Sequence, residues 1–238
     1  MNIRRQIARV EVEAHRGEYG AWRKDYCKSY RATADRICRQ ALLEVQAYLD
    51  SRGSIISCRK GCAHCCVQYI SISLGHSLVI VEYIYANPLL LEPFLRRYEK
   101  WLSMMSGNAP LRTLERYTTL SPVVRRTPQD LLDEYAKLEV PCPFLAQDAC
   151  AIYPVRPICC ASHMSVSPPE RCRASSVLQP LICEATPSPA DLRELAALSD
   201  PVLSLHQETL PSLVFRLLTE GLPEVMRQLD RLAEGAQG

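Results

Sequence analysis

Twelve cysteines stand out in this 238-residue chain, and four of them lie within nine residues. The segment CRKGCAHCC contains Cys58, Cys62, Cys65 and Cys66 with spacers of three, two and no residues. Short spacers let a tight turn aim several sulfurs at one point while backbone amides approach them, which favours metal binding. Successive side chains of extended backbone point apart, so one of the adjacent pair Cys65 and Cys66 could serve a second centre.

A second set of cysteines follows in the segment CPFLAQDACAIYPVRPICC, at Cys142, Cys150, Cys159 and Cys160. Thiolates gathered in this way repel one another. Such a set therefore normally combines near and distant parts of a chain around a metal ion or cluster that neutralises the charge. We expect the two cysteine-rich segments to meet in space and to bind metal.

Five further residues in this part of the chain are weaker candidates. Cys172 and Cys183 have no neighbouring cysteine that fixes a spacing, and only Cys172 is kept as a candidate metal ligand. His64 and His163 could each supply a nitrogen ligand, although a lone His in such a loop is more often a solvated residue or a hydrogen-bond donor to a ligand. Arg156 could tune the thiolates through its charge, or be a surface residue.

Together the two segments resemble the YkgJ-type cysteine-cluster family, described as zinc- or iron-chelating proteins and often called Fe-S oxidoreductases. In that family a C-x2/3-C-x2-C-C cluster is followed by C-x-x-L and by C-x-I-Y-x-x-R-P-x-x-C, and the similar stretch here runs from Cys58 to Cys160. The resemblance implies Arg156 and Pro157 as the R-P pair. It also implies cofactor ligands at Cys58, Cys62, Cys65, Cys66, Cys142, Cys150 and Cys160.

This chain departs from the family pattern at two positions. Ala161 stands where the family usually has a basic residue, and Cys159 is an additional cysteine. Either Cys159 or Cys160 could therefore be the ligand at the end of the motif. The resemblance does not extend to the N-terminal helix or beyond about residue 175.

Composition places the chain among ordinary globular proteins, with 47% hydrophobic and 23% charged residues. The net charge of +2 is spread along the sequence without a basic tract, which argues against a nucleic-acid partner. The N-terminus lacks a secretory pattern, and the most apolar window, residues 70–91, has too many interruptions for a membrane span. We expect a cytoplasmic protein. In that reducing compartment, clustered cysteines are more often metal ligands or redox groups than disulfides.

Apolar residues at helical spacing predict a long amphipathic helix over residues 19–49, ending near Gly53. Cys27 and Cys38 lie on one flank of its apolar stripe, so we interpret them as core-edge residues and not as ligands. After the first cysteine cluster, VQYISIS alternates as a strand does, and Ser73 is expected to cap the next helix. Further helices are predicted over residues 74–86, 89–105, 128–138, 188–198, 211–220 and 223–233, with a loop over residues 107–127.

The segment over residues 140–189 has a different character, with nine prolines, six cysteines and little apolar periodicity. We therefore predict a mainly α fold, in which a helical domain surrounds an irregular cysteine-rich metal-binding core with at most one or two short strands. The expected parts are an N-terminal helical segment (1–53), the cysteine-cluster core (54–186) and C-terminal helices (187–238), together forming one compact domain.

Three functions are weighed for such a chain. The first is an iron–sulfur protein with one or two clusters, a redox or electron-transfer role and a redox or protein partner of unknown identity, since all-thiolate ligation suits such clusters. The second is a zinc-binding structural or interaction module, in which closed thiolate sites fold irregular loops. The third is a protein lysine methyltransferase-like enzyme, because the flagellin lysine-methylating proteins carry a similar cysteine cluster with a CPFL element.

Two further redox classes fit the sequence less well. The spacing of Cys58, Cys62 and Cys65 is that of radical S-adenosylmethionine enzymes, but those enzymes need repeated strand-helix units. A thiol-only redox catalyst normally places its C-x-x-C pair after a strand of an α/β unit, and the doubled Cys65-Cys66 does not fit that arrangement.

Overall fold

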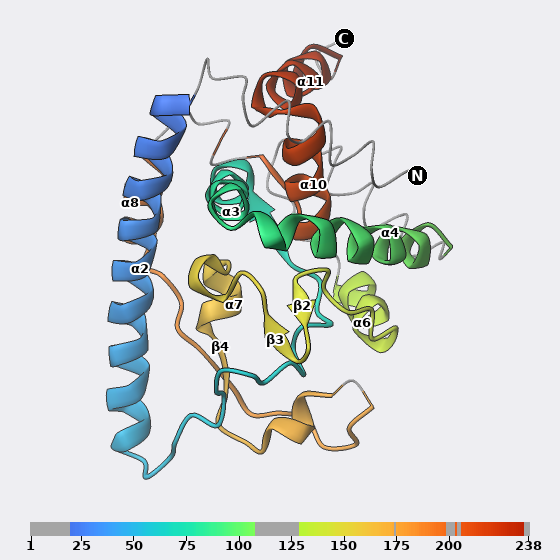
Figure 1. Ribbon diagram of the computed structural model, residues 1–238. Coiled ribbons are helices and arrows are strands. Elements are labelled where there is room, and N and C mark those ends of the chain that lie inside the picture. The colour runs from blue at the N-terminus through green and yellow to red at the C-terminus, as the bar shows by residue number, and fades with distance from the viewer. Residues whose placement is uncertain (1–19, 108–128, 174, 199–202, 204–205, 236–238) are drawn as a thin grey trace.

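The computed structural model describes residues 20–107, 129–173, 175–198, 203 and 206–235. Within these ranges the chain is mainly α-helical, which confirms the predicted fold class, and helices surround an irregular centre (Figure 1). The first 19 residues of the expected N-terminal segment and nearly all of the expected loop over residues 107–127 lie outside the described residues.

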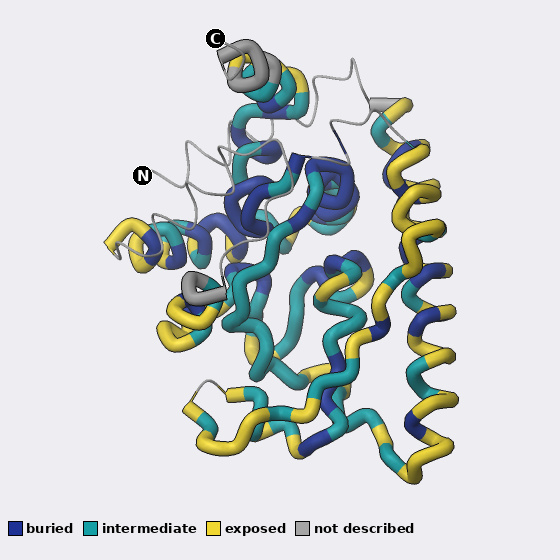
Figure 2. The backbone as a smooth tube through the Cα atoms, turned by 180° about the vertical axis from the view of Figure 1, so that it is seen from behind, coloured by how far each residue is buried: buried dark blue, intermediate teal, exposed yellow. Residues whose placement is uncertain are grey.

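The long helix α2 (Gly20–Asp50) forms one edge of the molecule (Figure 1). Its buried residues recur every three or four positions and therefore share one face: they include Tyr26, Tyr30, Ala34, Ile37 and Ala41. The other side of the helix is mostly exposed (Figure 2). The apolar periodicity predicts this helix to within one residue at its C-terminal end.

Two paired strands set where the central helices begin. β1 (Ser71–Ser73) pairs antiparallel with β6 (Gln207–Thr209), and α3 (Leu74–Ala86) and α10 (Leu210–Glu220) start directly after these strands. The short ladder thus places two helices side by side that are far apart in sequence. Most of α3 and α10 is buried, and they form the centre of the hydrophobic core (Figure 2).

The last residue of each strand caps the helix that follows. The Ser73 side chain accepts a hydrogen bond from the His76 backbone N–H, and the Thr209 side chain accepts one from the Ser212 backbone N–H. Each bond satisfies an N–H group that has no partner within its helix. The predicted cap at Ser73 is confirmed.

α2 and α3 pack closely because α3 carries a glycine at their contact. A Cβ atom at Gly75 would lie 2.2 Å from the Tyr26 hydroxyl and 3.2 Å from the Leu203 carbonyl oxygen. Both distances are too short for a side chain without movement of the neighbours. The absence of a side chain at Gly75 therefore sets the distance between the two helices.

A second group of helices packs on the other side of α3 and α10 (Figure 1). These elements are η2 (Pro88–Leu90), α4 (Leu91–Gly107), α6 (Gln129–Lys137) and α11 (Leu222–Gly235). Aromatic contacts join them to the core: Tyr98 of α4 stacks on Phe215 of α10 with ring centroids 4.2 Å apart. The Trp101 indole N–H donates a 3.0 Å hydrogen bond to the Tyr135 hydroxyl of α6.

The proline-rich part of the chain consists of short elements. They are β2 (Leu145–Ala146), β3 (Ala149–Cys150), η3 (Tyr153–Val155), α7 (Ile158–Ser162), β4 (His163–Ser165), η4 (Pro169–Cys172), β5 (Ile182–Glu184) and α8 (Pro189–Ala196). α8 begins with the capping box expected from its sequence, in which Ser188 and Asp191 exchange hydrogen bonds.

The number of strands exceeds the expectation of one or two. The described residues contain six short strands in three antiparallel pairs, β1-β6, β2-β3 and β4-β5. Each strand has only two or three residues, which is too short for an alternating pattern to be visible in sequence. The β2-β3 turn has positive φ angles at Gln147 and Asp148, of 49° and 58°.

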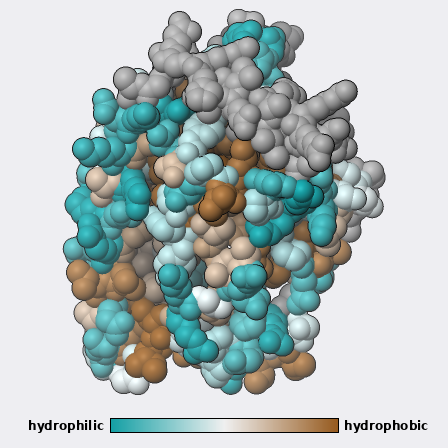
Figure 3. All heavy atoms as spheres, viewed as in Figure 1, coloured by the Kyte–Doolittle hydropathy of each residue, from teal (hydrophilic) through white to brown (hydrophobic). Residues whose placement is uncertain are grey.

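No single helix among the described residues is long and apolar enough to cross a membrane. α3 and the following η2-α4 segment meet the length and composition criteria only as a pair bent by 106°. Surface hydrophobic residues gather over the C-terminal end of α2 (Figure 3), where Leu42, Leu43, Tyr48 and Ile55 are large and exposed.

Candidate metal centre

One cavity brings the two cysteine-rich segments together. It has a volume of about 330 Å³. Its lining includes eight of the twelve cysteines, namely Cys58, Cys62, Cys65, Cys66, Cys142, Cys150, Cys159 and Cys160. The first four belong to the loop between α2 and β1, and the others belong to residues 142–160. Loops far apart in sequence thus present their sulfurs to a common space.

Backbone hydrogen bonds fix the two loops against each other. The Cys142 N–H donates a 2.8 Å hydrogen bond to the Cys66 carbonyl. Within the first loop, Cys62 N–H bonds to the Arg59 carbonyl in a tight turn, which Gly61 permits by adopting a φ of +91°. The cysteines of the first loop are therefore positioned by tight turns and not by a regular strand or helix.

Cys58 is held by residues more than 100 positions away. The hydroxyl of the preceding Ser57 lies 2.8 Å from the Ser165 carbonyl oxygen and 2.5 Å from the Ser167 carbonyl oxygen, and it shares its one proton between them. The Ser165 backbone N–H donates to the Cys58 sulfur at 3.1 Å. Burial raises the pKa of Cys58, while this N–H opposes the rise because it stabilises the thiolate.

Each adjacent cysteine pair shares a hydrogen bond between its sulfurs. In the first pair, the bond from Cys66 lowers the pKa of Cys65 to about 6, and the pKa of Cys66 is raised strongly by the same bond and by burial. In the second pair the Cys160 bond lowers the pKa of Cys159, and the pKa of Cys160 is raised. In each pair, one thiol therefore ionises more readily than its neighbour.

Cys142 and Cys150 resist ionisation. Burial raises the pKa of Cys142 to about 12, and it also raises the pKa of Cys150. Neighbouring thiolates raise the pKa of Cys66, Cys150 and Cys160 further. This many thiolates can form together only if a cation neutralises them, because each new negative charge repels the others.

Electrostatic coupling divides the cysteines into two groups. We call Cys58, Cys62, Cys65 and Cys172 the Cys58 set, because the first three raise the pKa of Cys172 and because Cys62 and Cys65 raise that of Cys58. We call Cys66, Cys142, Cys150 and Cys160 the Cys142 set, because Cys142 raises the pKa of both Cys66 and Cys160. The two sets are neighbours at Cys65 and Cys66. Cys65 also raises the pKa of Cys150 and Cys160, which belong to the Cys142 set.

Charged and titratable side chains also line the cavity, among them Arg59, Arg156, His163 and Glu184. Arg156 lines the cavity, and its charge lowers the pKa of Cys58, Cys65 and Cys150. The guanidinium carbon lies 4.2 Å from the ring centroid of Tyr153, which holds the side chain in place. His163 also lines the cavity, and its Nδ1 lies 3.2 Å from a Glu184 carboxylate oxygen. A carboxylate orients an imidazole in this way at many metal sites.

The weaker candidates occupy different places. Cys172, in η4, is half-buried and its thiol hydrogen bonds with the Ser165 side chain; it is the one member of the Cys58 set that does not line the cavity. Cys183 lies in β5 opposite Met164, and it does not line the cavity. His64 is half-buried in the first loop and also lies outside the cavity lining. Cys27 is buried in the hydrophobic core and Cys38 is half-buried on α2.

The adjacent Cys159 and Cys160 differ in exposure. Cys159 is exposed and also lines a second hollow beside Tyr30 and His76, whereas Cys160 is half-buried. Cys142 and Cys65 both raise the pKa of Cys160, so Cys160 lies near other cysteines of the cavity. At Cys159, by contrast, the Glu184 carboxylate partly opposes the lowering of the pKa by the Cys160 hydrogen bond. Its neighbours make Cys160 the better placed ligand of this pair.

The sulfurs do not converge on a single point. Within the described ranges, no group of three or more His, Cys, Asp or Glu side chains is arranged to hold one metal ion. A single zinc ion with Zn–S distances of about 2.3 Å requires its sulfurs to lie within roughly 4 Å of one another. An iron–sulfur cluster spreads its thiolates more widely, because each binds a different iron.

Sequence reasoning missed three residues of this site. Ser57, Ser165 and Glu184 act through hydrogen bonds to Cys58 or His163, or to the backbone beside them. Their partners are distant in sequence, so no local spacing could have indicated them.

Comparisons with protein-family models, with curated proteins and with solved structures found no match for this chain. The fold and the cavity therefore define the chain only as a mainly α protein with a cysteine-lined cavity, and the resemblance to the YkgJ-type family stays a prediction from its motifs.

Proposed function

We propose that the cysteine-lined cavity binds one iron–sulfur cluster at each of its two cysteine sets, and that the chain is a redox or electron-transfer protein of the YkgJ type. The observation that carries this proposal is the gathering of eight thiols from two distant loops around one cavity. Clusters of the [2Fe–2S] and [4Fe–4S] types take four ligands each, and seven of these cysteines together with Cys172 or His163 supply eight.

The two sets assign ligands to the two clusters. Cys66, Cys142, Cys150 and Cys160 would hold one, at the wall where the two loops are hydrogen bonded to each other. Cys58, Cys62 and Cys65 would hold the other, with Cys172 or His163 nearby to complete it. Adjacent Cys65 and Cys66 would then serve different clusters, which avoids turning both side chains to one iron.

A bound cluster supplies reversible one-electron transfer, with a potential set by charge, hydrogen bonds to sulfur and exposure. Arg156 would favour the reduced, more negative state through its positive charge. The Ser165 N–H would act in the same direction through its hydrogen bond to Cys58. We also propose a cytoplasmic location, because a reducing compartment keeps such thiols available to metal.

Quantification of iron, acid-labile sulfide and zinc on anaerobically prepared protein tests this proposal. We expect iron and sulfide in near-equal amounts and a broad absorption band near ~400 nm from cysteine-ligated clusters. Zinc without iron or sulfide would overturn it.

A zinc-binding structural module is the second candidate. The observation that favours it is the contact between His163 and Glu184, the carboxylate–histidine arrangement common at zinc sites. A site of three thiolates and one imidazole would then tie the β4-β5 pair to the first cysteine loop. Loss of zinc on substitution of His163, with no change in iron, would support this candidate.

A further inference from the structure

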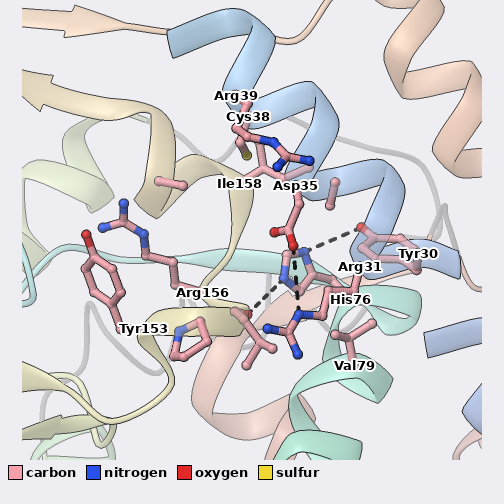
Figure 4. A pocket seen from close by; sticks show the side chains of 14 residues that line it. Tyr30, Arg31, Asp35, Cys38, Arg39, His76, Val79, Tyr153, Arg156 and Ile158 are labelled. Atoms are coloured by element: carbon pink, nitrogen blue, oxygen red, sulfur yellow. Dashed lines mark hydrogen bonds and ion pairs between the residues drawn. The ribbon is translucent and has the colours of Figure 1, made fainter. Parts of the chain in front are cut away.

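A second cavity, of about 360 Å³, lies between α2, α3 and the segment formed by η3 and α7. Figure 4 shows Arg31, Asp35 and Arg39 reaching it from α2 and His76 from α3, with Arg156 on the opposite side. Arg156 also lines the cysteine-lined cavity, so the two cavities are neighbours. Sites for small molecules commonly have this size.

The charged side chains of this second cavity leave an excess of positive charge. Three guanidinium groups face one carboxylate, that of Asp35, which lies 3.9 Å from Arg31. Among the residues that the structure describes, no carboxylate pairs with Arg39 or Arg156. Arg39 therefore remains available to an anion, and guanidinium binds carboxylate and phosphate through paired hydrogen bonds. Arg156, which stacks on Tyr153, adds positive charge from the opposite side of the cavity (Figure 4).

The other titratable side chains do not change this balance at neutral pH. Burial lowers the pKa of His76 to about 4, so its ring is neutral. The Nε2–H donates to the Val155 carbonyl at 3.3 Å, and Nδ1 accepts from the Tyr30 hydroxyl at 3.4 Å (Figure 4). Burial raises the pKa of Tyr30 to about 12 and also raises the pKa of the Cys38 thiol, so both are uncharged.

The remainder of the wall is largely apolar. Val79, Val155 and Ile158 are among its lining residues, and the first two are buried. Such a wall favours an apolar group, whereas a simple inorganic ion would gain nothing from it. The cavity thus has positively charged side chains at its rim, such as Arg39, and apolar side chains such as Val79 and Val155 on its inner wall.

We propose that this second cavity binds a small organic anion, with a carboxylate or phosphate on Arg39, in the positive field of Arg156, and an apolar body against Val79, Val155 and Ile158. This inference goes beyond the proposed function and does not depend on a bound metal. Because Arg156 lines both cavities, the bound anion lies next to the cysteine-lined cavity. The charge of the anion and the charge of the thiolates therefore act on each other.

Isothermal titration of the full chain with four probes tests the proposal. Benzoate and phenyl phosphate carry an anionic head on an aromatic body, benzyl alcohol lacks the charge, and inorganic phosphate lacks the body. We expect benzoate or phenyl phosphate to bind at one site with a Kd of about 1 mM or tighter, and the two control probes to bind at least tenfold more weakly. The stronger of the two anions identifies the head group. Lack of saturable binding by both, or equal binding of benzyl alcohol, would overturn the proposal.

Matched charge reversals locate the site. Arg39→Glu, on the rim, is expected to weaken the stronger probe at least tenfold, whereas Arg52→Glu, just beyond the end of α2, should change binding less than twofold. Both side chains are exposed, so both variants should fold, which thermal unfolding checks. Equal weakening by both variants would show a non-specific charge effect and contradict the site. Iron measured in the same samples should be unchanged by Arg39→Glu, so failure of this proposal is distinguishable from failure of the iron–sulfur proposal.

Discussion

The backbone N–H of Cys142 donates to the carbonyl oxygen of Cys66 at 2.8 Å, joining the two cysteine-rich loops at their centre. Cys142 raises the pKa of both Cys66 and Cys160, which is why Cys66 belongs to the Cys142 set. Cys65, the preceding residue, raises the pKa of Cys58 and also that of Cys66, Cys150 and Cys160. The two proposed clusters would therefore meet at the peptide bond between Cys65 and Cys66.

The two sets are expected to lose metal separately. Cys142→Ser should remove about half of the iron and sulfide, Cys62→Ser should remove the other half, and the double variant should retain almost none, because each cluster depends on its own four ligands. Cys183→Ser is the matched control and should keep the full amount, since Cys183 does not line the cavity. Complete loss in either single variant would mean one shared cluster.

Ser57 is expected to matter for metal retention although it is not a ligand. Ser57→Ala removes the hydroxyl that bonds to the Ser165 and Ser167 carbonyls and helps to anchor the backbone beside Cys58. Removal of such bonds costs about 1–2 kcal/mol, and we expect iron to be lost to a chelator several-fold faster than from the original protein. Ser51→Ala removes an exposed bond to the Tyr48 carbonyl and serves as control. Equal loss rates for both variants would contradict the anchoring role.

The glycine at the α2-α3 contact gives a test of the fold. Gly75→Ala is expected to lower the free energy of unfolding by about 1–3 kcal/mol, because the new methyl group would overlap the Tyr26 hydroxyl. Gly107→Ala should have little effect, since no atom lies within 4 Å of a Cβ there. Urea unfolding measures both.

A double-mutant cycle identifies the cause. In the Tyr26→Phe background the hydroxyl is absent, so Gly75→Ala should cost less than it does in the original protein. An unchanged cost would locate the strain elsewhere, such as at the Leu203 carbonyl oxygen.

A buried ionic network predicts how stability depends on pH. Glu208 lies between His206 and Arg216, bonded to His206 at 2.8 Å. Burial alone would raise the pKa of Glu208, but the His206 hydrogen bond and the Arg216 charge together lower it below its usual value. The carboxylate thus stabilises the fold above its unfolded pKa of about 4.3, and this contribution is lost as the pH falls through the lower folded pKa.

Glu208→Gln tests this network by removing the charge. We expect a loss of roughly 3 kcal/mol at pH 7, since Arg216 and His206 lose a buried partner. The difference between the two proteins should shrink as the pH falls below 4. A difference that is constant over pH 3–7, measured by thermal unfolding, would show that the charge of Glu208 is not the cause.

The helices could be predicted from sequence because their causes are local. The apolar stripe of α2, the Ser73 cap of α3 and the capping box of Ser188 and Asp191 are all contained within a few residues. The strands could be predicted only in part. The alternation of VQYISIS indicates a strand where β1 lies, whereas the pairs β1-β6 and β4-β5 join distant segments, as Ser71 with Thr209 and Ser165 with Ile182. Pairing of distant segments leaves no periodicity in strands of two or three residues.

The candidate site shows the same division between local and distant causes. The spacing of Cys58, Cys62 and Cys65 predicts a metal site from sequence alone, because the turn that contains these cysteines is formed by neighbouring residues. The amide that reaches the Cys58 sulfur belongs to Ser165, and the carboxylate that contacts His163 belongs to Glu184. Only the folded chain brings these groups together, so their roles could not be predicted from the sequence.

X-ray absorption of anaerobically prepared protein at the iron and zinc edges tests the central claim most directly. The account predicts iron surrounded by four sulfurs, with a second shell of iron scatterers, as in clusters held by thiolates. Iron that is absent or bound by nitrogen and oxygen, or zinc alone surrounded by sulfur, would contradict it.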